Sequence, residues 1–192
     1  MSNNRNGFVE NKEFKRIDFR TESLAVEYAD CLFENCHFQE VDLSGISFDN
    51  CRFEGCDLSL AKVRDTAFRE IRFSNCKLLG IRFEYGNTFG LSLDFTGCLL
   101  NFASFFRLKL KETVFKNCQL VETDFAETDL SGAVFDECDL AGATFDHTNL
   151  EKADFRTAVN YIIHPESNRI KKAKFSAAGL AGLLTGYGIE IE

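Results

Sequence analysis

The chain has 192 residues, a formal net charge of −8 and a hydrophobic content of 45%. It contains 21 Phe and eight Cys but only one Pro and no Trp, and no apolar run approaches the length of a membrane-spanning helix. The polar N-terminus lacks the apolar segment of a secretory signal, so we expect a soluble, cytoplasmic protein without a membrane partner. A net negative charge also disfavours direct binding of nucleic acid.

Residues 1–30 show an irregular spacing of large apolar residues. Phe14 and Phe19 are five residues apart, whereas Tyr28 and Phe33 arrive one residue early relative to that spacing. The ends of a solenoid need polar caps, and degenerate repeats with charged residues supply them. We therefore predict a degenerate N-terminal coil and cap.

Residues 31–155 contain two superimposed periods. Large apolar residues recur every five residues, as they do without a break from Phe95 to Phe155. Six cysteines follow one another at intervals of 20, 20, 22, 20 and 20 residues: Cys36, Cys56, Cys76, Cys98, Cys118 and Cys138. An amphipathic helix has a period of 3.6 and a flat strand a period of 2, so neither accounts for a period of five.

A chain that turns a corner every five residues and closes one coil every twenty explains both periods. Successive coils then stack at the inter-strand distance of roughly 4.8 Å, which places the six cysteines in one internal column. A second column of aromatic residues lies on the neighbouring wall: Phe33, Phe53, Phe73, Phe95, Phe115, Phe135 and Phe155. Both columns contain the same 22-residue gap, which indicates a single two-residue insertion.

The repeated unit has the form small, polar, Leu or Phe, and two further residues. Thr128-Asp129-Leu130-Ser131-Gly132 and Ala153-Asp154-Phe155-Arg156-Thr157 are clear examples. With these motifs the chain resembles the pentapeptide repeat family. The resemblance implies an all-β fold, a right-handed quadrilateral parallel β-helix, here with a short C-terminal α-helix.

The eight cysteines are predicted to be reduced, buried thiols. Residues in one column have Cβ atoms near 4.8 Å apart, which exceeds the usual distance of roughly 3.5–4.5 Å across a disulfide. A ladder of parallel thiols also cannot surround a zinc ion tetrahedrally.

The two-residue insertion falls in residues 84–90, Glu84-Tyr85-Gly86-Asn87-Thr88-Phe89-Gly90, where seven residues replace one unit of five. Two glycines and Asn87 favour turns, so we expect a small bulge at one corner. Two interpretations stay open. The bulge is either a tolerated insertion without a role or a contact site for a partner, with Glu84, Tyr85 and Asn87 as candidate residues.

Residues 156–192 are predicted to form a final irregular coil, a short helix and a tail. Ser176 suits a helix N-cap, and Gly186 suits the end of that helix. The apolar residues of this segment are more than one coil end can hide: Leu180, Leu183, Leu184, Ile189 and Ile191. We therefore predict a two-fold homodimer through the C-termini, with a helix that only caps its own rod as the alternative.

Charge is distributed unevenly along the chain. Residues 31–60 have one base and six acids, and residues 61–120 have ten bases and five acids. Residues 121–155 have ten acids and one Lys, a net charge of −9, and we call them the acidic block. Four of its aspartates precede large residues and are the candidate partner-binding residues: Asp124, Asp129, Asp139 and Asp154. Reversing these four charges is expected to leave the fold intact.

The sequence lacks the signatures of an enzyme. His37, His147 and His164 have no neighbours that a general base or a metal site would require. No phosphate-binding glycine motif or nucleophile elbow is present, and a left-handed β-helix acyltransferase would need a period of six. We expect no catalytic residues, no metal and no cofactor.

The layout of the chain resembles the pentapeptide proteins of quinolone resistance and microcin B immunity. The resemblance implies a mimic of duplex DNA that binds DNA gyrase or topoisomerase IV, and that modulates the enzyme or protects it from quinolones or toxins. In a dimer joined through the C-termini, the acidic block of each subunit would lie beside the junction. The alternative is a scaffold solenoid that binds another protein.

Overall fold

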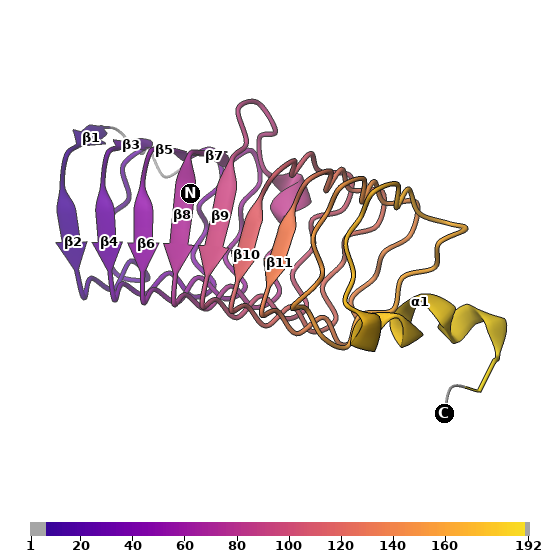
Figure 1. The fold of residues 1–192 in the computed structure, drawn as a ribbon. Helices are drawn as coiled ribbons and strands as arrows, with labels where there is room; N and C mark the ends of the chain where they lie inside the picture. The colour runs from indigo at the N-terminus through magenta and orange to yellow at the C-terminus, as the bar shows by residue number, and fades with distance from the viewer. Residues whose placement is uncertain (1–6, 191–192) are drawn as a thin grey trace.

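The computed structural model describes residues 7–190, which wind into a right-handed, four-sided parallel β-helix with a short helical segment at the C-terminal end (Figure 1). The predicted fold class is confirmed. One side carries a seven-stranded parallel sheet of order β11-β10-β9-β8-β6-β4-β2, and another carries a four-stranded parallel sheet of order β1-β3-β5-β7. The two remaining sides are joined by single parallel bridges, such as Leu99 with Gln119 and Ser104 with Asp124.

The strands are short because each wall of the coil spans only one repeat. The seven-stranded sheet consists of β2 (Glu13–Lys15), β4 (Leu32–Glu34), β6 (Arg52–Glu54), β8 (Ile71–Ser74), β9 (Leu93–Thr96), β10 (Val114–Lys116) and β11 (Val134–Asp136). The four-stranded sheet consists of β1 (Phe8–Glu10), β3 (Glu27–Ala29), β5 (Ser47–Asp49) and β7 (Ala67–Arg69).

We name the four sides in chain order. Face A carries the seven-stranded sheet, faces B and C follow it, and face D carries the four-stranded sheet. Their buried inward residues include Phe95 and Phe115 on face A, Leu100 and Leu120 on face B, Phe105 and Phe125 on face C, and Leu110 and Leu130 on face D.

The corners between faces require a left-handed backbone. Within residues 7–190, 21 non-glycine residues have a positive φ, and none of them is β-branched. This exclusion follows from sterics, because a branched Cβ clashes with the backbone in the left-handed region. All but two of these residues are polar or charged, and the two exceptions are Leu60 and Phe102.

The aromatic column predicted on face A is confirmed. The ring of Phe115 stacks between those of Phe95 and Phe135, with centroids 5.2 and 5.0 Å away and planes tilted by 5° in both cases. Edge contacts with Phe105 and Phe125 on face C, at 5.9 and 5.8 Å, fill the rest of the shaft. Offset stacking and edge contacts are both favourable aromatic arrangements, so each coil locks the next in register.

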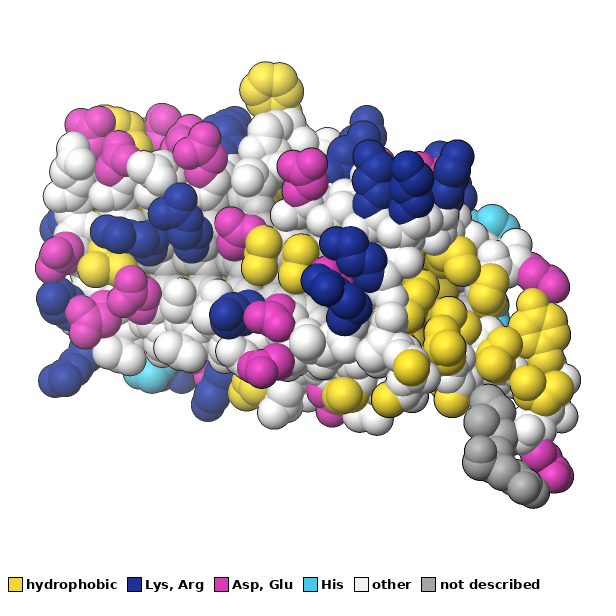
Figure 2. Space-filling view, in the orientation of Figure 1, with side chains coloured by type: hydrophobic (Ala, Val, Ile, Leu, Met, Phe, Trp, Pro, Cys, Tyr) yellow, Lys and Arg dark blue, Asp and Glu magenta, His cyan; other side chains and the backbone are white. Residues whose placement is uncertain are grey.

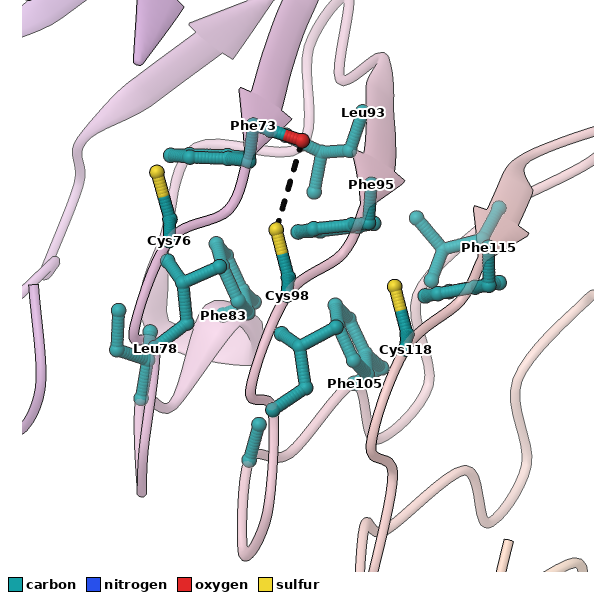
Figure 3. Close-up of a cluster of buried hydrophobic side chains, with 14 of the residues drawn as sticks. Phe73, Cys76, Leu78, Phe83, Leu93, Phe95, Cys98, Phe105, Phe115 and Cys118 are labelled. Atoms are coloured by element: carbon teal, nitrogen blue, oxygen red, sulfur yellow. Dashed lines mark hydrogen bonds between the residues drawn. The ribbon is translucent and has the colours of Figure 1, made fainter. Parts of the chain in front are cut away.

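All eight cysteines are free and buried, as predicted. Figure 3 shows Cys76, Cys98 and Cys118 in one column beside the aromatic column. The Cys98 thiol donates to the carbonyl oxygen of Phe73 in the preceding coil, at 3.4 Å (Figure 3). Burial raises the pKa of Cys51 to about 12, so this thiol stays protonated at neutral pH.

Threonine hydroxyls beside face C donate hydrogen bonds to the preceding coil, as the cysteine thiols do beside face A. The Thr128 hydroxyl donates to the carbonyl of Phe105 at 2.8 Å, and the Thr148 hydroxyl donates to that of Phe125 at 2.8 Å. Where the small residue of a unit is Cys or Thr, its side chain can therefore donate to the coil before it; Ala, as at Ala133, fills the same position without a side-chain donor. This hydrogen bond explains why Cys and Thr share that position in the repeat.

The insertion forms a loop that stands out from the shaft next to β9 (Figure 1). Phe73 pairs with Phe95, so the register resumes with the two extra residues left outside the coil. A 3-10 helix, Phe83–Tyr85, precedes the loop, and the Asn87 amide still donates to the Thr66 carbonyl at 2.8 Å. The projecting part is therefore residues 88–91, a narrower segment than the predicted 84–90.

Stacking continues beyond the most regular repeats at both ends. Phe14 stacks on Phe33 at 4.9 Å, and Phe175 stacks on Phe155 at 5.4 Å. The first coil is one residue short, because Phe14 pairs with Phe33 nineteen positions later. The division of the chain at residues 30 and 155 stays a prediction.

The C-terminal segment is less regular than a single helix. It comprises a 3-10 turn (Ala177–Gly179), α1 (Ala181–Leu184) and a second 3-10 turn (Thr185–Tyr187). The Ser176 hydroxyl accepts a hydrogen bond from the Gly179 amide at 3.1 Å, which confirms its role as an N-cap. The prediction that Gly186 ends the segment is wrong, because the left-handed residue that ends it is Gly188, with φ 61°.

We predict that Phe115→Ala lowers the free energy of unfolding by about 3–5 kcal/mol, because it leaves a cavity between two stacked rings. Val114→Ala is the matched control, since Val114 is on the same strand but faces outward and is 38% exposed. The measurement is urea unfolding followed by circular dichroism. Equal losses in the two variants would contradict the buried column.

Candidate protein-binding surface

The four candidate aspartates lie on four different faces of the rod. Parallel bridges place Asp154 on face A, Asp139 on face B, Asp124 on face C and Asp129 on face D. The structure therefore does not bring them together into one patch. The acidic block surrounds the shaft instead of marking one side of it.

Each of these aspartates also stabilises the corner that follows it. One carboxylate oxygen accepts a hydrogen bond from the backbone amide two residues later, at 2.9 Å for Asp124, 3.1 Å for Asp129, 3.1 Å for Asp139 and 3.2 Å for Asp154. Such Asx turns explain why the repeat favours Asp at this position. Reversing all four charges would also remove four turn caps, so it does not separate surface charge from stability, and the expectation of an intact fold stays a prediction.

Half of the acidic block is paired with bases from the same or neighbouring coils. Five of its carboxylates form six such pairs in the described chain: Arg107–Glu127 at 2.8 Å, Lys111–Asp129 at 3.4 Å, Lys116–Asp136 at 3.5 Å, Arg169–Glu151 at 2.8 Å, Arg156–Asp154 at 2.7 Å and Lys174–Asp154 at 3.5 Å. Exposed pairs of this kind add little stability, but each reduces the local negative field. Glu122 and Glu137 stay exposed at corners, and Asp146 pairs only with His147 at 3.0 Å.

A basic coil separates the acidic block from the C-terminal end. Residues 156–175 contain five Lys or Arg residues and one Glu. Figure 2 shows Lys and Arg side chains gathered on this part of the shaft. One basic coil lies between the acidic block and the C-terminal segment, because this coil stacks directly on the block through Asp154 and Lys174. The expected place of the block beside a dimer junction stays a prediction.

The insertion residues differ in how far they reach solvent. The Glu84 carboxylate accepts from Arg82 Nε at 2.6 Å and is only 9% exposed, so it is held against the shaft. Tyr85 is half exposed, and its ring lies under the guanidinium groups of Arg64 and Arg82, at 5.9 and 5.7 Å from the ring centroid.

The most exposed residue of the loop is one that the sequence analysis did not select. Phe89 is 79% exposed, and its amide donates to the Asn87 side chain at 2.9 Å, which fixes the turn beneath it. The sequence could have indicated Phe89, because an aromatic residue inside an insertion has no interior position in the solenoid to occupy.

The C-terminal segment exposes part of its apolar surface. Leu180 and Ile189 are 46% and 55% exposed, whereas Leu183 packs against the core and Leu184 is half-buried. Figure 2 shows hydrophobic side chains gathered on this end of the molecule. Ile191 lies outside the described residues. Leu183 therefore caps the rod, whereas Leu180 and Ile189 face solvent. The homodimer stays a prediction.

A hollow of about 400 Å³ lies between the last coil and the C-terminal segment, bordered by Arg156, Val159, Tyr161 and Gly182. The Tyr161 hydroxyl is buried there without a hydrogen-bond partner, and burial raises its pKa. Within residues 7–190, no group of three His, Cys, Asp or Glu side chains could hold a metal ion. In the same range, no helix has the length and apolar character needed to cross a bilayer.

The chain belongs to the pentapeptide repeat family. The profile of the pentapeptide repeat region matches residues 26–105, and the profile of eight-copy pentapeptide repeats matches residues 118–156. No sequence among the curated proteins matches the chain.

Solved structures share the fold at low identity. A trypsin-treated variant of QnrB1, a plasmid-mediated fluoroquinolone resistance protein, is 21% identical with a TM-score of 0.50, over 98% of this chain and 99% of that one. HetL, a pentapeptide repeat protein of heterocyst differentiation from the cyanobacterium Nostoc sp., is 18% identical with a TM-score of 0.46, over 87% of this chain and 84% of that one. At 21% identity the likeness to QnrB1 shows the fold alone.

The ion pair at Asp154 predicts a pH-dependent contribution to stability. Hydrogen bonds from Arg156 lower the pKa of Asp154 to about 2, from 3.8. Because the folded pKa is the lower one, the contribution is present above about pH 4 and is lost as the pH falls through about 2.

We predict that Asp154→Asn lowers the free energy of unfolding by about 1 kcal/mol near pH 7 and that this effect shrinks steadily as the pH falls from about 4 to about 2. Urea unfolding across this range measures the difference between variant and wild type. Asp146→Asn is the control, because that carboxylate is exposed and accepts no backbone hydrogen bond; its effect should stay below about 0.5 kcal/mol. A difference for Asp154→Asn that persists unchanged near pH 2 would refute the assignment.

Proposed function

We propose that this protein is a non-enzymatic binding protein that engages DNA gyrase or topoisomerase IV as an acidic mimic of duplex DNA. In this role it modulates the enzyme or protects it from quinolones or toxins. The observation that carries the proposal is the placement of the acidic block, whose ten carboxylates encircle the shaft on all four faces. A rod with negative charge on every side is the shape that a DNA-binding surface accepts.

The charge density supports this proposal. At 20 residues per coil, residues 121–155 rise by roughly 8 Å along the axis. Within the described chain, five of the ten carboxylates make no ion pair with Lys or Arg: Glu122, Asp124, Glu137, Asp139 and Asp146. Lys152 in the same residues also makes no ion pair within the described chain, so the net of four negative charges over that rise is roughly one charge per 2 Å, slightly below the one per about 1.7 Å of duplex DNA.

Two further features suit such a partner. QnrB1, whose fold this chain shares, is named as a fluoroquinolone resistance protein, which makes a topoisomerase the first partner to test. The loop at residues 88–91 presents an exposed aromatic side chain, Phe89, away from the acidic block, where it can contact a flanking domain. The proposal includes a two-fold dimer through Leu180, Ile189 and their neighbours, which would place the basic coil at the centre and one acidic block on either side.

The test reverses charges whose carboxylates do not cap a turn. Glu122→Lys, Glu137→Lys and Asp146→Lys change three exposed carboxylates of the acidic block, none of which accepts a backbone hydrogen bond. Glu40→Lys, Glu54→Lys and Glu70→Lys make the same change in the N-terminal coils and form the matched control. Each triple variant is assayed for gyrase supercoiling and quinolone-stabilised cleavage, with enzyme from the same host.

We predict that the acidic-block variant needs at least about tenfold more protein to match the wild-type effect, because charge complementarity drives the encounter. The amount of the control variant needed for the same effect is expected to stay within about twofold of the wild-type amount. Higher ionic strength is expected to weaken the effect of the wild-type protein on the enzyme. Unchanged urea midpoints verify the folds. A wild type without effect on either assay would remove gyrase as the partner and favour the scaffold alternative.

The dimer is tested separately by sedimentation equilibrium at micromolar concentration. The wild type is expected to be dimeric, and Leu180→Glu together with Ile189→Glu is expected to be monomeric. Leu183 is left unchanged, because it packs against the core of its own subunit. A monomeric wild type would show that the segment only caps its own rod.

A further inference from the structure

Two exposed apolar residues occupy strained corner positions on the same edge of the rod. Leu60 and Phe102 have φ angles of 57° and 61°, and they are 55% and 58% exposed. Every other non-glycine residue with positive φ in residues 7–190 is polar or charged. Neither side chain fills the core, so packing does not explain an apolar residue where the backbone favours Asn or Gly.

These residues belong to a continuous apolar row along the corner between faces B and C. Backbone hydrogen bonds stack the corners: Leu60 to Leu79 at 2.9 Å, Gly80 to Asn101 at 3.0 Å, and Phe102 to Val121 at 3.0 Å. The Leu60 side chain lies over Gly80, where an added Cβ would come within 2.8 Å of it. We call Leu60, Leu79, Phe102 and Val121 the apolar corner row.

A set of cations lies beside this row on face C. Lys62 and Arg64 are exposed, and neither forms an ion pair within the described chain. Arg64 and Arg82 both rest on the Tyr85 ring, which holds their guanidinium groups in place. We call Lys62, Arg64 and Arg82 the cationic row. Arg82 is paired with Glu84 at 2.6 Å, whereas Lys62 and Arg64 have no ion pair within the described chain and are free to meet a complementary anion.

We propose that the apolar corner row and the cationic row together bind an amphipathic, acidic helix of a partner protein. The apolar corner row runs along the rod axis over four successive coils, and the cationic row lies beside it on the first two of them. A helix rises about 5.4 Å per turn, close to the coil spacing of about 4.8 Å, so successive turns meet successive coils. Apolar side chains at i, i+3 and i+4 then contact Leu60 and Phe102, and carboxylates beside them meet Lys62 and Arg64.

The observations favour a helix over the other occupants. An extended strand repeats its same-face side chains every roughly 6.7 Å, which does not match the coils. A nucleic acid strand longer than the patch would meet Asp42 and Asp124, which flank the cationic row on the same face. The proposal does not depend on the DNA-mimic function, because its charged contacts are cations outside the acidic block, and only Val121 of the apolar corner row belongs to that block.

The test selects ligands without assuming their sequence. A phage-displayed library of random linear peptides is selected on the full-length protein, with counter-selection on the double variant Lys62→Glu/Arg64→Glu. The selected peptides are expected to be enriched in Asp and Glu, with apolar residues at helical spacing. Peptides that lack this pattern, or that bind the double variant equally well, overturn the proposal.

Affinity for the best selected peptide is then measured by fluorescence anisotropy. Lys62→Glu/Arg64→Glu is expected to weaken binding at least about tenfold. The control is Lys171→Glu/Lys172→Glu, which makes the same charge change at two exposed lysines of the last coil. Its affinity for the peptide is expected to stay within about twofold of the wild-type value. Equal losses in both would indicate general electrostatics and overturn the assigned surface.

Phe102→Asn separates docking from folding. Asn adopts the left-handed region more readily than Phe, so the urea midpoint should not fall, whereas peptide affinity should drop at least about fivefold. A lower urea midpoint with unchanged peptide affinity would show that Phe102 stabilises the fold, and would overturn its role in binding the helix. Binding of labelled oligo(dT) that is abolished by Lys62→Glu/Arg64→Glu would assign the face to nucleic acid and overturn the proposal. Concentration-dependent sedimentation that is abolished by the same double variant would assign the face to a second copy of the chain and also overturn it.

Discussion

In-register stacking of one coil on the next is the constraint on which the rest of this structure depends. Each inward ring, such as Phe115, lies between identical rings of the neighbouring coils, with planes tilted by only 5°. Several of the Cys and Thr residues at the small position of the repeat also donate to the preceding coil, as Thr128 does to Phe105. Because every coil contacts only its neighbours, local sequence defines position along the rod, and a change in one coil acts on the adjacent coils first.

The same constraint limits what surface charge means. An aspartate before a large inward residue, such as Asp124 or Asp139, caps the next corner and serves the fold first. A count of acidic residues therefore overstates the charge available to a partner. The carboxylates at exposed corners, such as Glu122 and Glu137, do not cap the next corner, so they are the better indicators of a binding surface.

The rod presents two surfaces of opposite character at different heights. The acidic block encircles the shaft and suits a cation-rich, DNA-binding partner, whereas the cationic row and the apolar corner row of face C suit an acidic helix. A solenoid can carry both because outward positions are independent of the core. Strain at Leu60 and Phe102 distinguishes the second surface from ordinary variation in charge.

The sequence by itself determined the fold, the register, the buried thiols and the two-residue insertion, because a strict period places every residue relative to the coil below it. Only the tertiary structure decided which side chains meet across coils, such as Arg107 with Glu127. It also decided the broken C-terminal segment, where Gly182 packs so closely on Tyr161 that a Cβ would clash with the backbone. The physical reason is that periodicity fixes backbone positions, whereas rotamers, ion pairs and the segment beyond the last repeat depend on packing in three dimensions.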